Sequence, residues 1–441
     1  MTMPAQFVLP ASALPAPARR TGRIDARRSG LPAAPLTADV PRSLAHWLCL
    51  AAVYLTIATS GVVFSEPAPV DVLTMGLLVL LPVVGLLHVT PSLALYLALW
   101  LVVGAGGLFS IAAMPAVDDP GLGKVVTFTA VSIYLSVASF TFAAFIAKAP
   151  RRHASLILSA WTLAAIIAAT TALAGYVSAF PGAYDLFTKF GRAAGTFKDP
   201  NVFGPFLVGP IVYMLHLVVN RPLERALLPL AVAGVLALAL LLSFSRGAWF
   251  VLAVAILAYG WLAYVTTPSR LAGERIVALL TIGIAILAGL VAIALQFDAV
   301  SGLMSERASL SQSYDYGPEG RFGGQAKAID LIAHNPLGIG ALVFGRVYHA
   351  EEAHNVYLSM LLNAGWLGGG VYWLLVLATI GYGFRHALQR LPSQPLFLVV
   401  YATFLAQALE GFIIDTDHWR HFYLLMGMVW GLMARPHDAD T

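Results

Sequence analysis

Charged residues are scarce in this chain, and their scarcity decides the class of protein. Only 11% of the 441 residues are Asp, Glu, Lys or Arg, whereas 59% are hydrophobic, and the mean hydropathy is +0.80. Soluble domains carry about 25% charged and about 45–50% apolar residues. The composition therefore excludes an ordinary soluble protein and indicates one embedded in the lipid bilayer.

Cysteine is almost absent. The single Cys49 lies in the first apolar run, which excludes a disulfide framework and a cysteine-based metal site. His349 and His354 are five residues apart, which does not match the i, i+4 spacing of paired ligands on a helix. We expect no metal and no cofactor. The net charge of +4 is small, and the positions of the basic residues along the chain explain it better than nucleic-acid binding does. We therefore expect no nucleic-acid partner.

The two ends of the chain lack hydrophobic periodicity. Residues 1–42 are rich in Ala, Pro and Arg and predict a disordered basic tail. No apolar core follows the early arginines before Leu44, which argues against a cleaved signal peptide. We expect a transmembrane domain over residues 43–435 and a short tail at 436–441.

Long apolar runs dominate the rest of the chain. A helix needs roughly 20 apolar residues to cross the hydrocarbon core. The runs predict an all-α polytopic membrane protein with about twelve spans, and the short break around 243–249 separates two of them. The predicted spans are 44–64, 70–88, 92–113, 125–147, 154–176, 201–219, 226–244, 247–266, 276–296, 355–383, 395–414 and 419–434.

The positions of Lys and Arg predict the orientation. With the N-terminus inside, the cytoplasmic segments hold 16 of the 26 basic residues but only 6 of the 22 acidic ones. This satisfies the positive-inside rule and indicates that both termini are cytoplasmic. The opposite, outer face then carries the unusual motifs, in segments 65–71, 113–124, 177–200, 243–249, 297–353 and 415–421.

Several basic residues on the outer face break that rule, and three arginines among them lie in unusual motifs. Arg192 precedes "DPN", where Asp199 can cap a helix that begins with Pro200, with Asn201 beside it. Arg192 either extends to lipid headgroups or serves a site.

Arg246 lies in "SFSRGAW" between two apolar runs, where an arginine is costly and marks a functional candidate. Ser245 in the same motif is expected to cap or hydrogen-bond locally. Arg321 opens an amphipathic stretch within the large loop 297–353, predicted to be a helix on the outer surface. Planar guanidinium groups match phosphate oxygens, so the three arginines can form a diphosphate clamp.

His354 lies where the long loop meets the tenth span, with Glu351, Glu352 and Asn355 as neighbours. It is either a helix-start residue or a general base, because a carboxylate neighbour fixes the tautomer of an imidazole.

A second polar group, which includes Asp415, Asp417 and His418, either supports the site or forms a solvated loop face. The glycine-rich "GAGG" (104–107) and "GWLGGG" (365–370) fall inside spans and predict close helix packing or a kink.

These motifs, in this order, resemble the O-antigen ligase and polymerase superfamily. The resemblance rests on "GRAAGTFKDPNVFG", "SFSRGAW", the Arg321-led helix ending "NPLGIG" and "HNVYLSMLLNAGWLG", and covers residues 185 to 375. It implies a metal-independent glycosyltransferase of the inner membrane that faces the periplasm. Such an enzyme takes a glycan from an undecaprenyl diphosphate carrier.

The resemblance also implies roles for single residues. Arg192, Arg246 and Arg321 would hold the donor diphosphate, and His354 would deprotonate the acceptor hydroxyl. The acceptor would be lipid A-core for a ligase or a growing polysaccharide for a polymerase. A transporter of lipid-linked sugars is the alternative from another class, but it should carry ionisable residues near the bilayer midplane.

Overall fold

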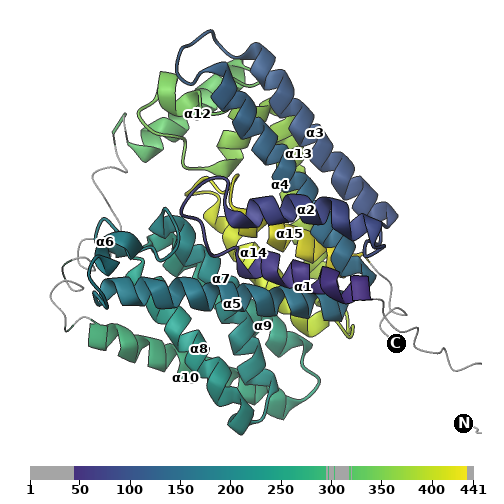
Figure 1. Ribbon diagram of the computed structural model, residues 1–441, viewed down its shortest axis with the longest axis vertical. Coiled ribbons are helices and arrows are strands. Elements are labelled where there is room, and N and C mark those ends of the chain that lie inside the picture. The colour runs from purple at the N-terminus through teal and green to yellow at the C-terminus, as the bar shows by residue number, and fades with distance from the viewer. Residues whose placement is uncertain (1–43, 295, 297–301, 303–316, 319, 435–441) are drawn as a thin grey trace, which may run out of the picture. The chain divides into compact units, whose positions relative to one another are not determined.

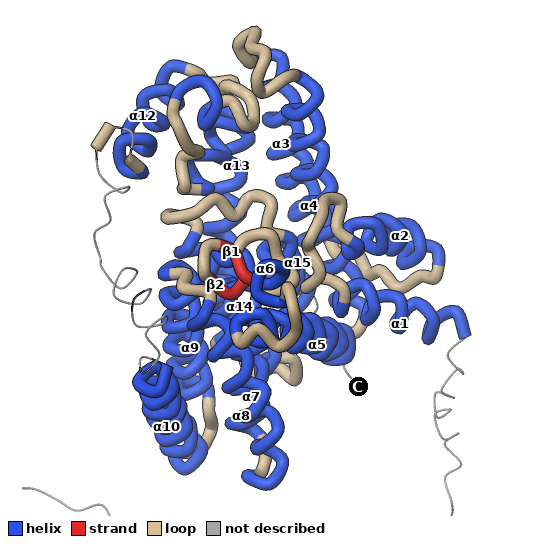
Figure 2. Tube along the Cα trace, turned by 60° about the vertical axis from the view of Figure 1, so that its left-hand side comes forward, coloured by secondary structure: helices blue, strands red, loops and turns tan. Residues whose placement is uncertain are grey.

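The computed structural model describes residues 44–434 except 295, 297–301, 303–316 and 319, and it is built almost entirely of helices (Figure 1). The predicted tails at 1–42 and 436–441 lie outside the described residues. Within the described part, the one sheet is a pair of two-residue strands, β1 (Thr188–Lys189) and β2 (Arg192–Ala193), beside the short helix α6 (Ala183–Phe187) (Figure 2).

Each predicted span contains one long helix. The helices are α1 (Leu44–Ala58), α2 (Pro69–Val83), α3 (Pro91–Ala113), α4 (Leu122–Lys148), α5 (Pro150–Tyr176), α7 (Pro200–Asn220), α8 (Leu223–Leu242), α9 (Arg246–Thr266), α10 (Arg270–Ala294), α13 (Val356–Ala387), α14 (Gln394–Glu410) and α15 (Arg420–Met433).

Length and hydropathy qualify seven of the described helices as membrane spans: α3, α4, α5, α7, α8, α9 and α13. Three shorter helices, α1, α2 and α14, are also apolar. The chain is thus a multi-pass helical membrane protein, whereas the total of twelve spans and their orientation stay predictions.

Two expected features of the outer segments are present. The amphipathic helix predicted in the long loop is α12 (Arg321–His334), and the motif "SFSRGAW" is a tight hairpin between α8 and α9. A π-helical turn, η2 (Phe344–Tyr348), precedes the start of α13 and was not expected from the sequence.

The segments assigned to the outer face lie at one end of the helix bundle and contact each other. The contacts join Val63 N–H to Thr196 O (2.8 Å), Lys198 to Glu66 (3.5 Å), Arg192 Nε–H to Ser243 O (2.7 Å), Arg346 to Asp119 (3.8 Å), Arg420 to Asp71 (2.7 Å) and His354 N–H to Asp415 Oδ2 (3.0 Å). In the sequence, only the positions of Lys and Arg had assigned these segments to the same face. The side of the membrane that this end faces is still a prediction.

The glycine-rich motifs pack α3 against α13, as expected. A Cβ on Gly106 would lie 2.4 Å from Ala364 O and 2.8 Å from the Cα of Gly368, so the two backbones touch there. Gly365 has a φ of 66° and kinks α13. The kink lets the carbonyl of Pro336 accept a hydrogen bond from Trp366 N–H (2.9 Å), which ties the segment after α12 to α13.

Candidate functional site

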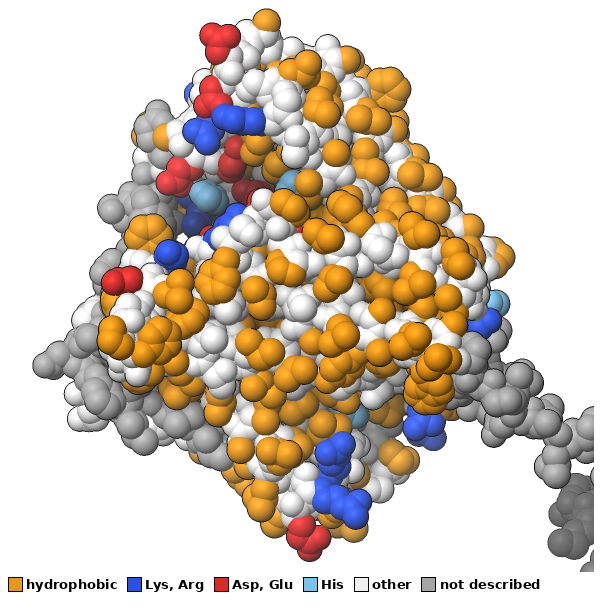
Figure 3. All heavy atoms as spheres, viewed as in Figure 1, with side chains coloured by type: hydrophobic (Ala, Val, Ile, Leu, Met, Phe, Trp, Pro, Cys, Tyr) orange, Lys and Arg blue, Asp and Glu red, His pale blue; other side chains and the backbone are white. Residues whose placement is uncertain are grey.

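Charged and histidine side chains gather in a hollow on an otherwise hydrophobic surface. The hollow lies between the part of the molecule around α12 and the part around α6, and Lys, Arg, Asp, Glu and His atoms lie within it (Figure 3). Polar groups of this density are costly among membrane helices unless they have a function. The residues predicted from sequence lie at this end of the bundle.

Arg192 ties two of the predicted motifs together. Its Nε donates to the carbonyl of Ser243 (2.7 Å) and its Nη2 to Oδ1 of Asn201 (2.7 Å), and the residue is 7% exposed. It does not extend to headgroups. Asp199 caps α7 by accepting from the N–H of Asn201 (2.8 Å), as predicted.

Arg246 is the first residue of α9, and Ser245 caps that helix by accepting from Ala248 N–H (3.4 Å). The next residue, Gly247, lies against a buried acid that the sequence did not single out. A Cβ on Gly247 would be 2.6 Å from Oε1 of Glu410, which is 1% exposed at the end of α14. The lack of a side chain at Gly247 therefore lets α14 place a carboxyl group beside the first turn of α9.

Arg321 is the first residue of α12, and the same turn packs against a histidine. A Cβ on Gly324 would lie 2.9 Å from the ring of His349, which is 9% exposed. His349 in turn accepts a hydrogen bond from the N–H of Glu351 through Nδ1 (3.2 Å). Through this contact α12 adjoins the segment that carries His354.

His354 is held in an unusual backbone conformation. Its φ is 48°, in the left-handed region that residues other than glycine rarely adopt. Its N–H donates to Oδ2 of Asp415 (3.0 Å), and the side chain of Asn355 caps α13 by accepting from the N–H groups of Tyr357 and Leu358. The strained residue is thus fixed on both sides by side-chain hydrogen bonds to backbone.

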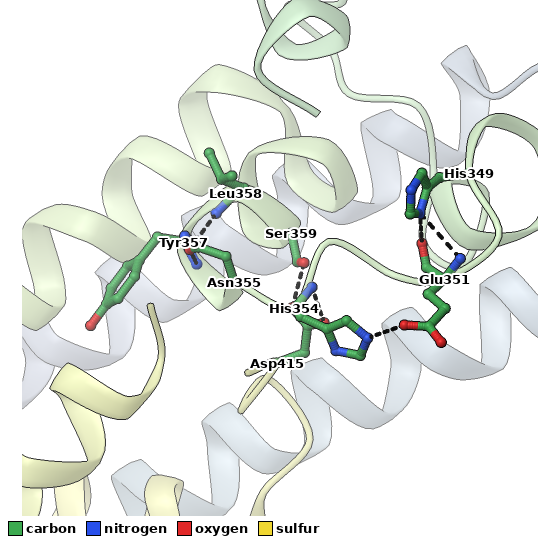
Figure 4. A network of polar contacts seen from close by, with 8 residues as sticks. All are labelled: His349, Glu351, His354, Asn355, Tyr357, Leu358, Ser359 and Asp415. Atoms are coloured by element: carbon green, nitrogen blue, oxygen red, sulfur yellow. Dashed lines mark hydrogen bonds and ion pairs between the residues drawn. The ribbon is translucent and has the colours of Figure 1, made fainter. Parts of the chain in front are cut away.

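The imidazole of His354 lies between two carboxyl groups (Figure 4). Its Nε2 is 3.0 Å from Oε2 of Glu351, and its Nδ1 is 4.0 Å from Oδ2 of Asp415. When Nε2 donates to Glu351, Nδ1 carries the lone pair that can accept a proton.

Of the two glutamates expected beside His354, Glu351 contacts its imidazole (3.0 Å), whereas Glu352 points elsewhere. Consecutive residues of this extended loop point in different directions, and Oε1 of Glu352 lies 2.7 Å from the position of a Cβ on Gly345. Burial and the nearby Asp415 raise the pKa of Glu352 to about 7. Its part in the site is therefore indirect.

Asp415 and Asp417 lie behind His354 in a buried acidic group. Asp415 also accepts a hydrogen bond from the hydroxyl of Ser359 (2.5 Å), and burial raises its pKa. Burial, Asp415 and Glu352 raise the pKa of Asp417 to about 8. Close carboxyl groups disfavour each other's ionisation, which adds to the effect of burial on the pKa of Asp417.

The segment 415–421 is largely buried and does not form a solvated loop face. Thr416, Asp417 and His421 are buried, because the segment packs between α2, α4 and the rest of the bundle. Arg420 forms a two-point ion pair with Asp71 (2.7 and 2.7 Å), a partner 349 residues away. His418 stacks on Phe128 with ring centres 3.8 Å apart and lies on the α4 side of the segment.

A series of contacts connects the four predicted residues into one region. Arg192 bonds the hairpin that leads to Arg246, and Glu410 contacts that first turn of α9. The next residue, Gly411, accepts from Val356 N–H (2.8 Å), two residues after His354. The helices that begin beside these residues are α7, α9, α12 and α13, and helix N-termini favour anions.

The arrangement suits anion binding next to proton transfer. Buried arginine and helix N-termini can stabilise negative charge, while a histidine flanked by carboxyl groups can accept a proton. Among the described residues, no group of His, Cys, Asp and Glu is arranged to hold a metal ion.

Comparison with known proteins agrees with the sequence motifs. No curated protein matches the chain. A family model described as O-antigen ligase matches residues 230–373, a stretch that includes Arg246, Arg321 and His354 but not Arg192. That match and the multi-pass helical fold support the resemblance to the O-antigen ligase and polymerase superfamily for this part of the chain.

Proposed function

We propose that the protein is a membrane glycosyltransferase that moves a glycan from a polyprenyl diphosphate carrier to an acceptor hydroxyl. We propose that its reaction is that of an O-antigen ligase. The observation that carries the proposal is the imidazole of His354, held 3.0 Å from Glu351 on a strained backbone, at the end of the bundle where the arginines gather. The charge distribution favours the non-cytoplasmic side of the membrane for this end, and the family resemblance implies that this side is the periplasmic face of the inner membrane.

The donor diphosphate would lie against the arginines. Arg246 and Arg321 each begin a helix, so a guanidinium and a helix N-terminus act together on an anion at two places. The buried Arg192 adds positive charge and fixes the hairpin that carries Arg246. The polyprenyl tail would lie along the apolar helices.

The acceptor hydroxyl would be activated by His354. As its oxygen bonds to the anomeric carbon of the donor sugar, its proton passes to the imidazole, and the bond from that carbon to the diphosphate oxygen breaks. Polyprenyl diphosphate leaves with both electrons of that bond. Negative charge grows on the leaving oxygens, where fixed cations stabilise it most. One base acting on the acceptor favours a single inverting displacement without a metal.

A ligase and a polymerase share this chemistry and differ in the acceptor, which is lipid A-core or another surface glycan for a ligase and a carrier-linked repeat for a polymerase. We favour the ligase because the matching family model carries that description. A transporter is less consistent with ionisable groups gathered at one end of the bundle.

A deletion strain tests the proposal and separates the candidates. Loss of a ligase leaves long polymer on the carrier lipid and none on the acceptor, whereas loss of a polymerase leaves single repeats. The strain is complemented with wild-type protein and with His354→Ala, and membrane insertion is checked by immunoblot. An inserted His354→Ala protein that restores normal glycans contradicts the assignment of the base.

A further inference from the structure

A second site lies beside the one described. A groove of about 670 Å³ opens between α2, α4 and the outer segments, within the volume range of ligand pockets. Its lining includes Glu66, Asp71, Lys124, Thr127 and Arg420. None of the residues assigned to donor binding or proton transfer lines it.

The charges on the lining balance. Each charged group of the lining has a partner: Arg420 pairs with Asp71 (2.7 Å), Lys124 with Asp119 (2.9 Å) and Glu66 with Lys198 (3.5 Å). The groove therefore offers no uncompensated positive charge for a phosphate. Carboxylates accept hydrogen bonds from hydroxyl groups, and guanidinium and ammonium groups donate to them. The lining therefore suits a neutral ligand that carries many hydroxyl groups.

Arg420 has donors left for such a ligand. A guanidinium carries five N–H groups. Arg420 directs two of them to Asp71, and its other N–H groups have no acceptor among the described residues. The ion pair also fixes the guanidinium plane, because both carboxylate oxygens are engaged at 2.7 Å. The free donors are thus preorganised on the wall of the groove.

The remaining part of the groove lining is apolar and aromatic. Met75 on α2 and Phe128, Val131 and Tyr134 on α4 line it. Met75 is 52% exposed on a helix that is apolar enough to lie in a membrane, so the groove is open toward lipid on that side. Aromatic rings also suit the C–H faces of sugar rings. Polar and apolar parts together fit an amphiphile.

Two further residues of the groove lining, His418 and Leu342, belong to segments that position His354. His418 lies three residues after Asp415, which bonds His354 N–H, and Leu342 lies just before η2 and the loop that carries Glu351. A headgroup in the groove would therefore lie against the same segments that position the proposed base.

We propose that this groove binds the sugar headgroup of a glycolipid acceptor, with the lipid tail leaving between α2 and α4. The identity of this ligand as the acceptor rests on the proposed function. The binding of a neutral amphiphile with a sugar headgroup in the groove does not depend on that function. Donor and acceptor would then approach His354 from different sides, the anionic one along the arginines and the neutral one from the groove.

Cysteine protection tests the groove directly. The natural Cys49 is 1% exposed, so a single introduced cysteine can be labelled in the full-length protein. Thr127→Cys places a thiol in the groove, and Val126→Cys places an exposed thiol on the same turn of α4 outside its lining. Maleimide labelling is followed in nanodiscs with added dodecyl maltoside or dodecylphosphocholine, two amphiphiles that share a tail.

The maltoside should slow labelling of Thr127→Cys several-fold, while dodecylphosphocholine should not, and Val126→Cys should react equally in both. Equal protection by both amphiphiles, or by neither, overturns the proposal. In transfer assays, labelled Thr127→Cys should show a raised KM for acceptor glycolipid and an unchanged KM for donor. Unchanged acceptor KM in an active enzyme also overturns it, whereas absence of transfer by the wild type refutes the proposed function and leaves the protection result to decide the groove.

Discussion

At the scale of single residues, the site depends on how His354 is held. A left-handed backbone at a residue other than glycine costs of order 1–3 kcal/mol and persists only where the surroundings impose it. Here Asp415 accepts the N–H of His354, and Asn355 caps the helix that follows. The strain keeps the imidazole between Glu351 and Asp415, where a regular helical start would turn it elsewhere.

Asp415 should therefore act as a positioning residue. Asp415→Ala removes the acceptor for His354 N–H and should lower kcat by about 10²-fold, since misplaced groups cost that much, with little change in the KM for donor. Asp415→Asn keeps an oxygen acceptor and should recover much of kcat. Equal loss in the two variants would show that charge, rather than position, is what Asp415 supplies. Ser359→Ala, which removes only the second hydrogen bond, is the matched control.

Glu352 should make stability depend on pH. Its pKa is raised to about 7 from 4.5, so the folded protein holds this proton between those values while the unfolded chain releases it. Its contribution to stability is thus fully present below about pH 4.5 and is lost as pH rises toward 7. Glu352→Gln should remove this dependence and raise Tm relative to wild type at pH 8 more than at pH 5. Parallel Tm curves for the two proteins would contradict it.

At the scale of elements, the apolar runs predicted where the long helices lie, because a bilayer demands long uninterrupted hydrophobic segments. They did not predict η2, the β1–β2 pair or the choice of Glu351 over Glu352. Those features depend on partners distant in sequence, as the pairing of Asp71 with Arg420 illustrates. Glu410 was missed for the same reason, since only the fold reveals that it lies beside Gly247.

The contact of α3 with α13 should be sensitive to any added side chain. Gly106→Ala would place a Cβ 2.4 Å from a backbone oxygen of α13, and overpacking of this kind costs about 1–3 kcal/mol. The variant should unfold at a lower temperature in detergent. Gly234→Ala on α8, where a Cβ would meet nothing within 4 Å, is the control and should not lower Tm. An unchanged Tm for Gly106→Ala would show that α3 and α13 can move apart without loss of stability.

At the scale of the whole molecule, charge and contacts agree on the grouping of loops. The segments that the basic residues assign to one face contact each other at one end of the bundle, and the site lies among them. Sequence could predict this grouping because basic residues are retained on the cytoplasmic side. It could not predict the groove beside α4, which forms only when α2, α4 and the 415–421 segment pack together.

Labelling of intact spheroplasts tests the orientation. Asp118→Cys lies in an outer segment and Ser269→Cys in a predicted cytoplasmic loop between α9 and α10, both at exposed positions. A membrane-impermeant maleimide should label Asp118→Cys in intact cells and Ser269→Cys only after lysis. The reverse pattern would place the site on the cytoplasmic side and refute a periplasmic enzyme.

The most direct test of the account uses His354→Gly, because glycine tolerates the left-handed backbone and the variant loses only the imidazole. Glycan transfer from a polyprenyl diphosphate donor is measured with the purified variant in nanodiscs, with and without added imidazole. We expect a folded protein whose transfer falls at least about 10²-fold, within the range for loss of a general base, and partly recovers with imidazole. Full activity of His354→Gly without imidazole would contradict it.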